Sequence, residues 1–316
     1  MSNRPDRVTI VEEGPREGFQ SEPPGIPTQE KLRLIDALSE TGLSAIVCAS
    51  FVNQKTLPQM ADAEAIAQQL LKRPGIDYFG LWLNRKGFER ARASGLRLRA
   101  IVSASASATF LMKNNRRTPE EGLNDQRDLC LAYDEAGLPA GPAYIFTAFG
   151  CNYEGDMPIG TVTGCLRKLL ATVRDTGRDV SHVVLCDTVG YGNPALVERL
   201  VGEVRSIWPE LPVGLHLHDT RGLGLANAAA GLQLGVDYFD TSIGGLGGCP
   251  FAGNRSAAGN IATEELVFLC EEMGISTGID LEALLEAARV AGEIVGHPLP
   301  SRLLAAGSLA RFRNVL

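Results

Sequence analysis

Histidine is scarce in this sequence, which has only four histidines among its 316 residues. Aromatic residues make up only 6% of the chain, with two tryptophans. The seven cysteines are scattered, odd in number and without Cys-x-x-Cys spacing, so neither a disulfide framework nor a thiolate zinc site is indicated. Any metal site would therefore depend on the few histidines and on carboxylates.

Long apolar runs and an excess of basic residues are also missing. No run approaches the length of a membrane-spanning helix, and residues 1–7 lack the apolar segment of a secretory signal. The net charge of −7 and the pI near 5.3 argue against nucleic acid or a membrane surface as partner, because either normally requires a basic stripe. We therefore expect a cytoplasmic protein that binds neither.

What the chain does contain is a regular alternation of β-branched apolar runs and longer helical patterns. We predict strands over 8–13, 43–50, 77–83, 97–105, 142–149, 182–188, 212–219 and 238–245. Helices are predicted over 29–42, 61–73, 84–95, 118–137, 158–177, 193–210, 222–235 and 262–274. Eight βα units without a long linker predict an α/β fold, a (β/α)8 TIM barrel, with a doubly wound sheet as the alternative.

The end of the chain differs from this pattern. Residues 1–279 are predicted to form the barrel, and residues 280–316 a C-terminal helical extension with one amphipathic helix. This extension is expected to pack outside the barrel or at a subunit interface. A homo-oligomer, with a dimer as one form, is therefore expected.

Two of the four histidines, His216 and His218, stand in the apolar run LHLHD. Side chains alternate along a strand, so both imidazoles point to the same face. Neutral imidazole is a common ligand of divalent metals, and the pair would supply half of a typical ligand set. The alternative is a pair of hydrogen-bonded histidines in a polar core layer.

Unusual residues follow the predicted strands at their carboxyl ends, where barrel enzymes place their active sites. These segments are 13–20, 50–53, 150–155, 186–188, 244–250 and 259–260. In a closed barrel the seventh, eighth and first strands are neighbours. Glu17, His216, His218 and a residue after the eighth strand could therefore converge on one cation.

Seven motifs carry a resemblance to a known family. They are GPREGFQ for the family's GPRDGLQ, SFV followed by LPQM, GCNYEG for GCPYEG, DTVGYG for DTIGVG, HLHDT for HCHDT, and GLGGCPFA with GNIATEEL. Over roughly residues 8–300 the chain resembles the 3-hydroxy-3-methylglutaryl-CoA lyases, which belong to the metal-dependent Claisen-type lyases and synthases. The resemblance implies a TIM barrel, a divalent cation such as Mg²⁺ or Mn²⁺, and retro-Claisen cleavage of an acyl-CoA to acetyl-CoA and a 3-oxo acid such as acetoacetate.

The resemblance also implies roles for individual residues. The metal ligands would be Glu17, His216, His218 and Asn260. Arg16 would steady the thioester oxygen as it becomes an enolate, Asp187 would sit near the proton transfers, and Cys249 would be the general acid. Substrate contacts are expected from Gln20, Ser50, Lys113, Asn114 and Thr188.

Several of these residues have a simpler interpretation. Glu17 could form a salt bridge to Arg16 or Arg221, and Asn260 could be the N-cap of the helix over 262–274. The basic run over 113–117 could receive CoA phosphates or be a solvated helix entry. Cys151 could lie near the site or simply be exposed.

Three departures from the family motifs concern the substrate. Glu17 replaces an aspartate, Val47 replaces an acidic residue, and the stretch between Cys249 and Asn260 is two residues longer and contains Arg255. They leave open a lyase for a different branched 3-hydroxyacyl-CoA or hydroxy acid. A Claisen-type condensing enzyme and a barrel that binds acyl-CoA without turnover are the remaining alternatives.

Overall fold

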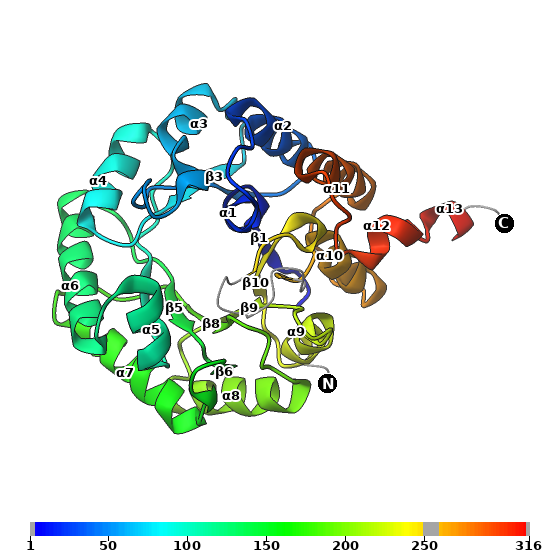
Figure 1. Cartoon of the computed structure of the whole chain (residues 1–316). Coiled ribbons are helices and arrows are strands. Elements are labelled where there is room, and N and C mark those ends of the chain that lie inside the picture. The colour runs from blue at the N-terminus through cyan, green and yellow to red at the C-terminus, as the bar shows by residue number, and fades with distance from the viewer. Residues whose placement is uncertain (1–3, 249–258, 314–316) are drawn as a thin grey trace.

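Eight parallel strands curl around a common centre, with helices outside them (Figure 1). This computed structural model describes residues 4–248 and 259–313. The strands are β1 (Thr9–Glu12), β2 (Ala45–Ser50), β3 (Asp77–Leu81), β4 (Val102–Ser105), β5 (Ala143–Phe146), β8 (Val183–Asp187), β9 (Val213–Leu217) and β10 (Tyr238–Thr241). They pair in the order β3-β2-β1-β10-β9-β8-β5-β4. The Arg97 N–H donates to the Tyr78 carbonyl at 2.9 Å and links the two ends of this row. The TIM-barrel prediction is confirmed.

Each barrel strand is followed by a helix on the outer side, as predicted. The outer helices are α2 (Thr28–Ser39), α3 (Ala63–Gln69), α4 (Arg85–Ser94), α6 (Pro119–Glu135), α7 (Ile159–Arg174), α8 (Pro194–Ile207), α9 (Gly224–Gln233) and α10 (Thr263–Glu272). Pro194 opens α8, where its fixed φ and missing N–H cost nothing. Gly95 ends α4 in the left-handed conformation that favours glycine.

The structure corrects two of the predicted boundaries and adds one helix. Regular pairing of β4 begins only at Val102, so the strand expected over 97–105 is shorter. Helix α3 stops at Gln69 because Leu70 is extended. An additional helix, α5 (Ala108–Asn115), follows β4, and its N-cap Ser107 accepts a hydrogen bond from the Phe110 N–H at 3.0 Å.

Short elements fill the loops at the carboxyl ends of the strands. They are η1 (Gly14–Gly18), α1 (Phe19–Ser21), η2 (Pro58–Met60), the two-stranded hairpin β6 (Gly150–Cys151) and β7 (Gly155–Asp156), and η3 (Ile243–Gly245). The first of these, η1, is a π-helical turn. Turns of this kind are rare and are frequent at functional sites.

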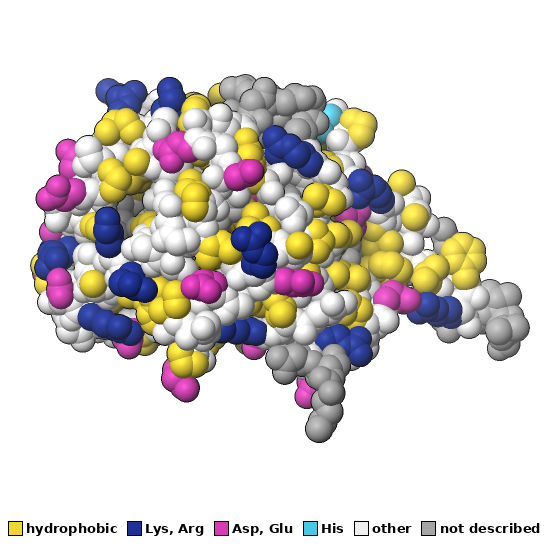
Figure 2. Space-filling view, turned by 90° about the horizontal axis from the view of Figure 1, so that it is seen from below, with side chains coloured by type: hydrophobic (Ala, Val, Ile, Leu, Met, Phe, Trp, Pro, Cys, Tyr) yellow, Lys and Arg dark blue, Asp and Glu magenta, His cyan; other side chains and the backbone are white. Residues whose placement is uncertain are grey.

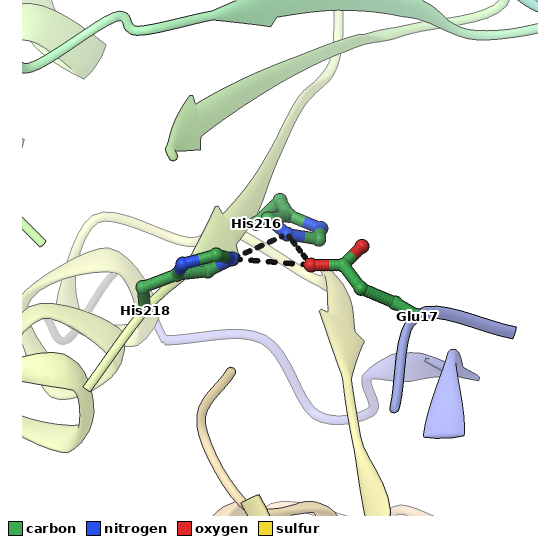
Figure 3. A group of neighbouring side chains, drawn as sticks. All are labelled: Glu17, His216 and His218. Atoms are coloured by element: carbon green, nitrogen blue, oxygen red, sulfur yellow. Dashed lines mark hydrogen bonds and ion pairs between the residues drawn. The ribbon is translucent and has the colours of Figure 1, made fainter. Parts of the chain in front are cut away.

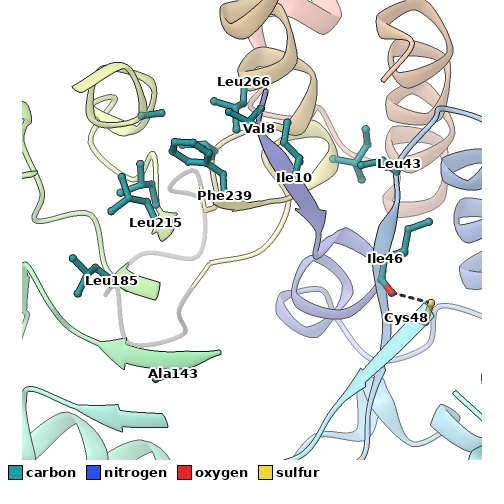
Figure 4. Close-up of a cluster of buried hydrophobic side chains, with 14 of the residues drawn as sticks. Val8, Ile10, Leu43, Ile46, Cys48, Ala143, Leu185, Leu215, Phe239 and Leu266 are labelled. Atoms are coloured by element: carbon teal, nitrogen blue, oxygen red, sulfur yellow. Dashed lines mark hydrogen bonds between the residues drawn. The ribbon is translucent and has the colours of Figure 1, made fainter. Parts of the chain in front are cut away.

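The main core lies between the strands and the outer helices. Alternate strand residues point outward into it, among them Ile10, Ile46, Leu185, Leu215 and Phe239 (Figure 4). The residues between them point into the barrel, where smaller apolar clusters form. This alternation places His216 inside the barrel, between the outward-facing Leu215 and Leu217.

Three helices follow the last barrel unit. They are α11 (Leu281–Val295), α12 (Arg302–Ala306) and α13 (Ala310–Arg313). Helix α11 lies beside α2 and α10 (Figure 1). Its N-cap Asp280 accepts hydrogen bonds from the N–H groups of Glu282 and Ala283, and its Leu284 and Leu285 are buried. The extension therefore completes the outer layer of helices, while a boundary at residue 279 stays a prediction.

The face shown in Figure 2 intersperses basic and acidic side chains among apolar ones. Across residues 4–248 and 259–313, none of the helices combines the length and the apolar character that crossing a bilayer requires.

Candidate metal centre

The turn η1 brings the first site residues to the mouth of the barrel. Gly14 N–H and Ile243 N–H both donate to Glu12 Oε1, at 2.7 and 2.8 Å, and so tie the end of β1 to η3. A Cβ on Gly14 would lie only 2.6 Å from that oxygen, so glycine is required here. The turn that results points Arg16 and Glu17 toward the end of β9.

Glu17, His216 and His218 form one cluster (Figure 3). Glu17 Oε1 lies 3.3 Å from His218 Nε2 and 3.7 Å from His216 Nε2, and the two ring nitrogens are 3.2 Å apart. One candidate ligand atom from each residue lies within 4.8 Å of the other two. Two imidazoles and a carboxylate meeting in this way are a donor set for a divalent cation.

The salt-bridge interpretation of Glu17 is half right. Its second oxygen, Oε2, lies 3.0 Å from Arg16 Nη2, while Oε1 faces the histidines. Arg16 also donates from Nε to Glu13 Oε2 at 2.9 Å. Arg221 instead donates to the carbonyls of the loop after β8 and takes no part in the cluster. Glu17 therefore links Arg16 to the candidate metal centre.

Asp240 fixes the orientation of His216. The β9–β10 register places the two residues side by side, and His216 Nδ1 lies 3.2 Å from Asp240 Oδ2. A carboxylate on Nδ1 holds the proton there and leaves Nε2 free to bind a cation. The assignment of that proton follows from the hydrogen bond.

Asn260 lies beside Glu17 and is not a helix cap, because α10 begins at Thr263 with Ala262 at its N-cap. Its Nδ2 is 3.1 Å from Glu17 Oε1, and its buried Oδ1 has no partner among the described residues. Amide oxygen and nitrogen exchange places by a flip of the side chain, which would turn Oδ1 toward the cluster. The unpartnered oxygen fits the role of a fourth ligand.

The charges of the centre also fit a bound cation. Burial alone would raise the pKa of Glu17, but Arg16 and His216 outweigh it and hold this pKa well below its usual range. Burial disfavours the imidazolium of His216, yet Glu17 and Asp240 raise its pKa to about 10. The carboxylates around the ring therefore favour positive charge at this point, and a divalent cation would supply it.

Arg16, Glu17, Val47, Phe146 and His216 line a cavity of about 90 Å³ inside the barrel. It is called the inner cavity below. Val47 faces this space from β2, so the acidic residue that the family resemblance implies at this position would line the same cavity as Arg16 and His216. The wall around Val47 and Phe146 is apolar instead.

Asp187 lies at the end of β8, close to this centre. Its two oxygens accept hydrogen bonds from the N–H groups of Tyr191 and Gly192, at 2.7 and 2.8 Å. Burial raises its pKa, although these two bonds act against the rise. Asp187 thus holds the loop after β8 in place, and its part in proton transfer stays a prediction.

The other expected contact residues are spread around the barrel mouth. Thr188 Oγ1 accepts a hydrogen bond from Thr147 N–H at 2.8 Å, and Ser50 is buried on β2. Gln20 is half-buried in α1. Lys113 and Asn114 are exposed on α5, where the Lys113 ammonium lies 5.2 Å from the centre of the Tyr153 ring. Their contacts with a substrate stay predictions.

The predictions for Cys249, Arg255 and Cys151 have different outcomes. Cys249 and Arg255 lie outside the described residues. Cys151 is buried, and its Sγ lies 3.2 Å from Ser107 Oγ, so the exposed alternative is wrong.

Asp240 and Glu13 are site residues that the sequence reasoning missed. Asp240 is a fully buried carboxylate in β10, which is unusual unless it has a partner. Its partner became visible only with the β9–β10 register. Glu13 enters the sequence analysis only as the first residue of the segment 13–20. A carboxylate three residues before Arg16 can pair with it on a helical turn, and this spacing was the available signal.

The chain is similar to known proteins over most of its length. Residues 7–291 match the model of the HMGL-like family. The hydroxymethylglutaryl-CoA lyase of Bacillus subtilis is 42% identical over 300 residues, which cover 95% of this chain and 97% of that protein. The mitochondrial hydroxymethylglutaryl-CoA lyase of Homo sapiens is 37% identical over 303 residues, with 96% and 90% covered.

Solved structures agree with the sequence comparison. The crystal structure of the Bacillus subtilis HMG-CoA lyase superposes with a TM-score of 0.88 at 40% identity, covering 96% of this chain and 98% of that one. A structure of an HMG-CoA lyase from Acinetobacter baumannii, in complex with coenzyme A and 3-methylmalate, gives 0.85 at 36% identity, with 96% of both chains covered. The chain belongs to the HMGL-like family.

Proposed function

We propose that this protein is a divalent-metal-dependent carbon–carbon lyase that cleaves 3-hydroxy-3-methylglutaryl-CoA to acetyl-CoA and acetoacetate. The observation that carries the proposal is the cluster of Glu17, His216 and His218, with Arg16 beside it in the inner cavity. The family membership supports the same reaction class. The proposed substrate is the one that the names of the similar lyases contain.

The reaction needs three events, and they balance without an oxidant or reductant. The tertiary hydroxyl loses its proton, and the bond between its carbon and the thioester's α-carbon breaks. The electron pair of that bond enters the thioester as an enolate, while the former alcohol becomes the ketone of the 3-oxo acid. The enolate carbon then takes up a proton to give acetyl-CoA.

A divalent cation bound by Glu17, His216, His218 and Asn260, such as Mg²⁺ or Mn²⁺, would lower the pKa of the substrate hydroxyl. Asp240 holds His216 in the tautomer that this ligand set requires. Arg16 faces the same space and can place its guanidinium at the developing enolate oxygen, since a positioned cation there stabilises the transition state.

The proton donors are proposed from the sequence motifs. Cys249 would return a proton to the enolate carbon, and Asp187 would act near the hydroxyl. The Asp187 carboxylate is held by Tyr191 and Gly192, so its first contribution is to fix the loop that borders His218. Gln20, Ser50, Thr188, Lys113 and Asn114 are proposed as substrate contacts.

The ligand class, the oligomeric state, the cellular location and the metal are also proposed. An acyl-CoA substrate is supported by the coenzyme A named for the Acinetobacter baumannii relative. Assembly as a homo-oligomer and a cytoplasmic location are proposed from composition and the amphipathic end of the chain. The metal inside the cell is proposed to be Mg²⁺ or Mn²⁺ from the family resemblance, and the carboxylate and amide oxygens of Glu17 and Asn260 suit both ions.

The test is cleavage of 3-hydroxy-3-methylglutaryl-CoA by metal-stripped protein, with Mg²⁺ or Mn²⁺ added back and acetyl-CoA followed. We expect turnover only after the cation is restored, and a loss of about 100-fold or more in kcat for Arg16→Gln. Absent turnover in protein that binds Mn²⁺ would overturn the proposed substrate. Unchanged turnover in Arg16→Gln would overturn the role of this residue.

A further inference from the structure

No ladder joins β3 to β4 in the described residues, and the line between these two strands is called the seam below. β3 forms its ladder with β2, and β4 forms its ladder with β5. In the part of the chain that the structure describes, the one bridge across this seam joins Phe79, in the middle of β3, to Arg97, which lies before β4. Higher up, the Ser103 N–H of β4 donates to Gln126 Oε1 of α6 at 2.9 Å instead of to β3. A side chain of an outer helix thus occupies the place of a strand partner.

A second cavity, of about 330 Å³, lies on the outer side of this seam. It is called the outer cavity below, and it is enclosed by β4, α5 and the first halves of α6 and α7. Leu83, Ser103, Gln126 and Phe146 line both this cavity and the inner one. The outer cavity therefore adjoins the space that contains Arg16, Glu17 and His216.

The outer cavity exists because side chains are missing from its walls. Gly160 and Gly164 of α7 line it, and a Cβ on either would meet nothing within 4 Å among the described residues. Glycine inside a helix is unfavourable without a reason in packing or function. Space for a ligand would explain the glycine at position 164, which lies in the middle of the α7 face that lines the cavity.

The remaining lining is largely apolar and includes Phe110, Leu111 and Leu123. The arginine in the wall, Arg117, is neutralised by Asp125 at 2.7 Å. Lys168 of α7 is the other cation among the described lining residues. The apolar part of the wall suits an alkyl group. An apolar cavity of about 150 Å³ already accepts benzene, so this volume is ample for a short chain.

We propose that the outer cavity is a subsite for an apolar substituent on the carbinol carbon of the substrate. The protein would then accept 3-hydroxyglutaryl-CoA thioesters in which a longer alkyl chain replaces the methyl group. The inference rests on the proposed function, because it requires the same bond to break at the same centre. Acetyl-CoA would still be released, and the 3-oxo acid would carry the longer chain.

The departure at Val47 agrees with this subsite. Val47 and Phe146 form apolar wall in the inner cavity, and Phe146 continues into the outer one. An alkyl chain that leaves the carbinol carbon would meet carbon atoms along this path. An acidic residue at position 47 would have placed a charge beside it.

The test compares two thioesters, 3-hydroxy-3-methylglutaryl-CoA and its analogue with a hexyl group in place of the methyl. Metal-loaded wild-type protein should cleave both. Gly164→Leu fills the outer cavity and should lower kcat/KM for the hexyl substrate by about 10- to 200-fold. The methyl substrate should keep its kcat/KM within about twofold, since its methyl group does not reach α7.

The matched control is Gly202→Leu on α8, an exposed helical glycine whose Cβ also meets nothing within 4 Å. It should leave both substrates unchanged. Leucine favours the helix over glycine at both positions, so both variants should fold.

Three results would overturn the subsite. Wild-type protein could cleave only the methyl substrate, which would leave the proposed function intact. Gly164→Leu could impair both substrates equally, which would show that the cavity holds a part common to both, such as the pantetheine arm. Cleavage of neither thioester by metal-loaded protein would overturn the proposed function, and the subsite with it.

Discussion

At the scale of single residues, the centre depends on groups that orient one another. Glu17 divides its two oxygens between Arg16 and the histidines, and Asp240 divides its own between His216 and Tyr144, whose hydroxyl lies 3.5 Å away. Buried charged groups persist in proteins when each has such partners. The loss of one partner should therefore be felt by the others.

Asp240→Asn tests this coupling. The amide is a weaker acceptor for His216 Nδ1 than the carboxylate, so His216 should become a poorer ligand. We expect Mn²⁺ affinity, measured by calorimetry, to fall about 10- to 100-fold, with little change in the unfolding midpoint. Asp237→Asn, at an exposed position on the same connection, is the control. Equal affinity in wild type and Asp240→Asn would contradict the orienting role.

Sequence was sufficient for the histidine pair because the period of a strand fixes which residues share a face. His216 and His218 do lie together, and Glu17 joins them as predicted. The sequence was not sufficient for Asp240, because its contact depends on the register between two strands. Register follows from packing of the whole barrel and leaves no local pattern.

At the scale of elements, the turn η1 sets the position of Arg16 and Glu17. Its geometry depends on Gly14, where a Cβ would lie 2.6 Å from Glu12 Oε1 and 2.7 Å from the Ile243 side chain. The sequence predicted a loop after the first strand but not a π-helical turn. Such turns have no simple residue signature, because their stability comes from the contacts that surround them.

Gly14→Ala should displace this turn. The added methyl group must push against buried carboxylate oxygen and apolar atoms, which costs about 1–3 kcal/mol of unfolding free energy. Turnover should fall as well, because Arg16 and Glu17 move with the turn. Denaturant unfolding and acetyl-CoA release measure the two effects. Gly202→Ala, at an open helical site, should be neutral or stabilising, and a Gly14→Ala protein as active and stable as wild type would refute the steric argument.

His182, which directly precedes β8, should make the stability of the protein depend on pH. Burial, helped by Arg99, lowers the pKa of His182 to about 4 from its ordinary 6.5. The folded chain thus keeps this ring neutral, and its contribution to stability is complete above pH 6.5. As the pH falls from 6.5 toward 4, His182 becomes protonated in the unfolded chain but stays neutral in the folded chain. The contribution of His182 to stability is therefore lost over this range.

His182→Asn removes this titration. Between pH 7 and pH 5, the variant should lose about 2 kcal/mol less unfolding free energy than wild type in denaturant titrations. His297→Asn is the control, because the Pro298 carbonyl and Glu22 raise the pKa of the exposed His297 and give the opposite sign. Parallel pH profiles for wild type and His182→Asn would show that His182 titrates normally.

At the scale of the whole molecule, the fold followed from the alternation of strands and helices. The eight predicted strands and helices all appear, because each long amphipathic helix and each β-branched run must bury its apolar side against the others. The short elements above the barrel, such as α5, were missed. Their few residues take their conformation from neighbours that only the closed barrel supplies.

The barrel also explains why distant segments form one centre. Ring closure makes β9, β10 and β1 neighbours, and the loops above them deliver His218, Asn260 and Glu17 to one point. At the β3–β4 seam, where no ladder among the described residues joins the two strands, four residues line both cavities. The candidate metal centre and the proposed subsite for the alkyl group thus lie at different parts of the barrel wall.

The cluster of Glu17, His216 and His218 is proposed to bind one cation, and lyase activity should depend on that bound cation. The most direct measurement titrates metal-stripped protein with Mn²⁺ and records bound metal and acetyl-CoA release from 3-hydroxy-3-methylglutaryl-CoA in the same samples. We predict that turnover rises in proportion to bound metal, reaches its limit at one ion per chain, and disappears together with metal binding in His218→Ala. Turnover that is full in stripped protein, or that persists in His218→Ala without bound metal, would contradict this claim.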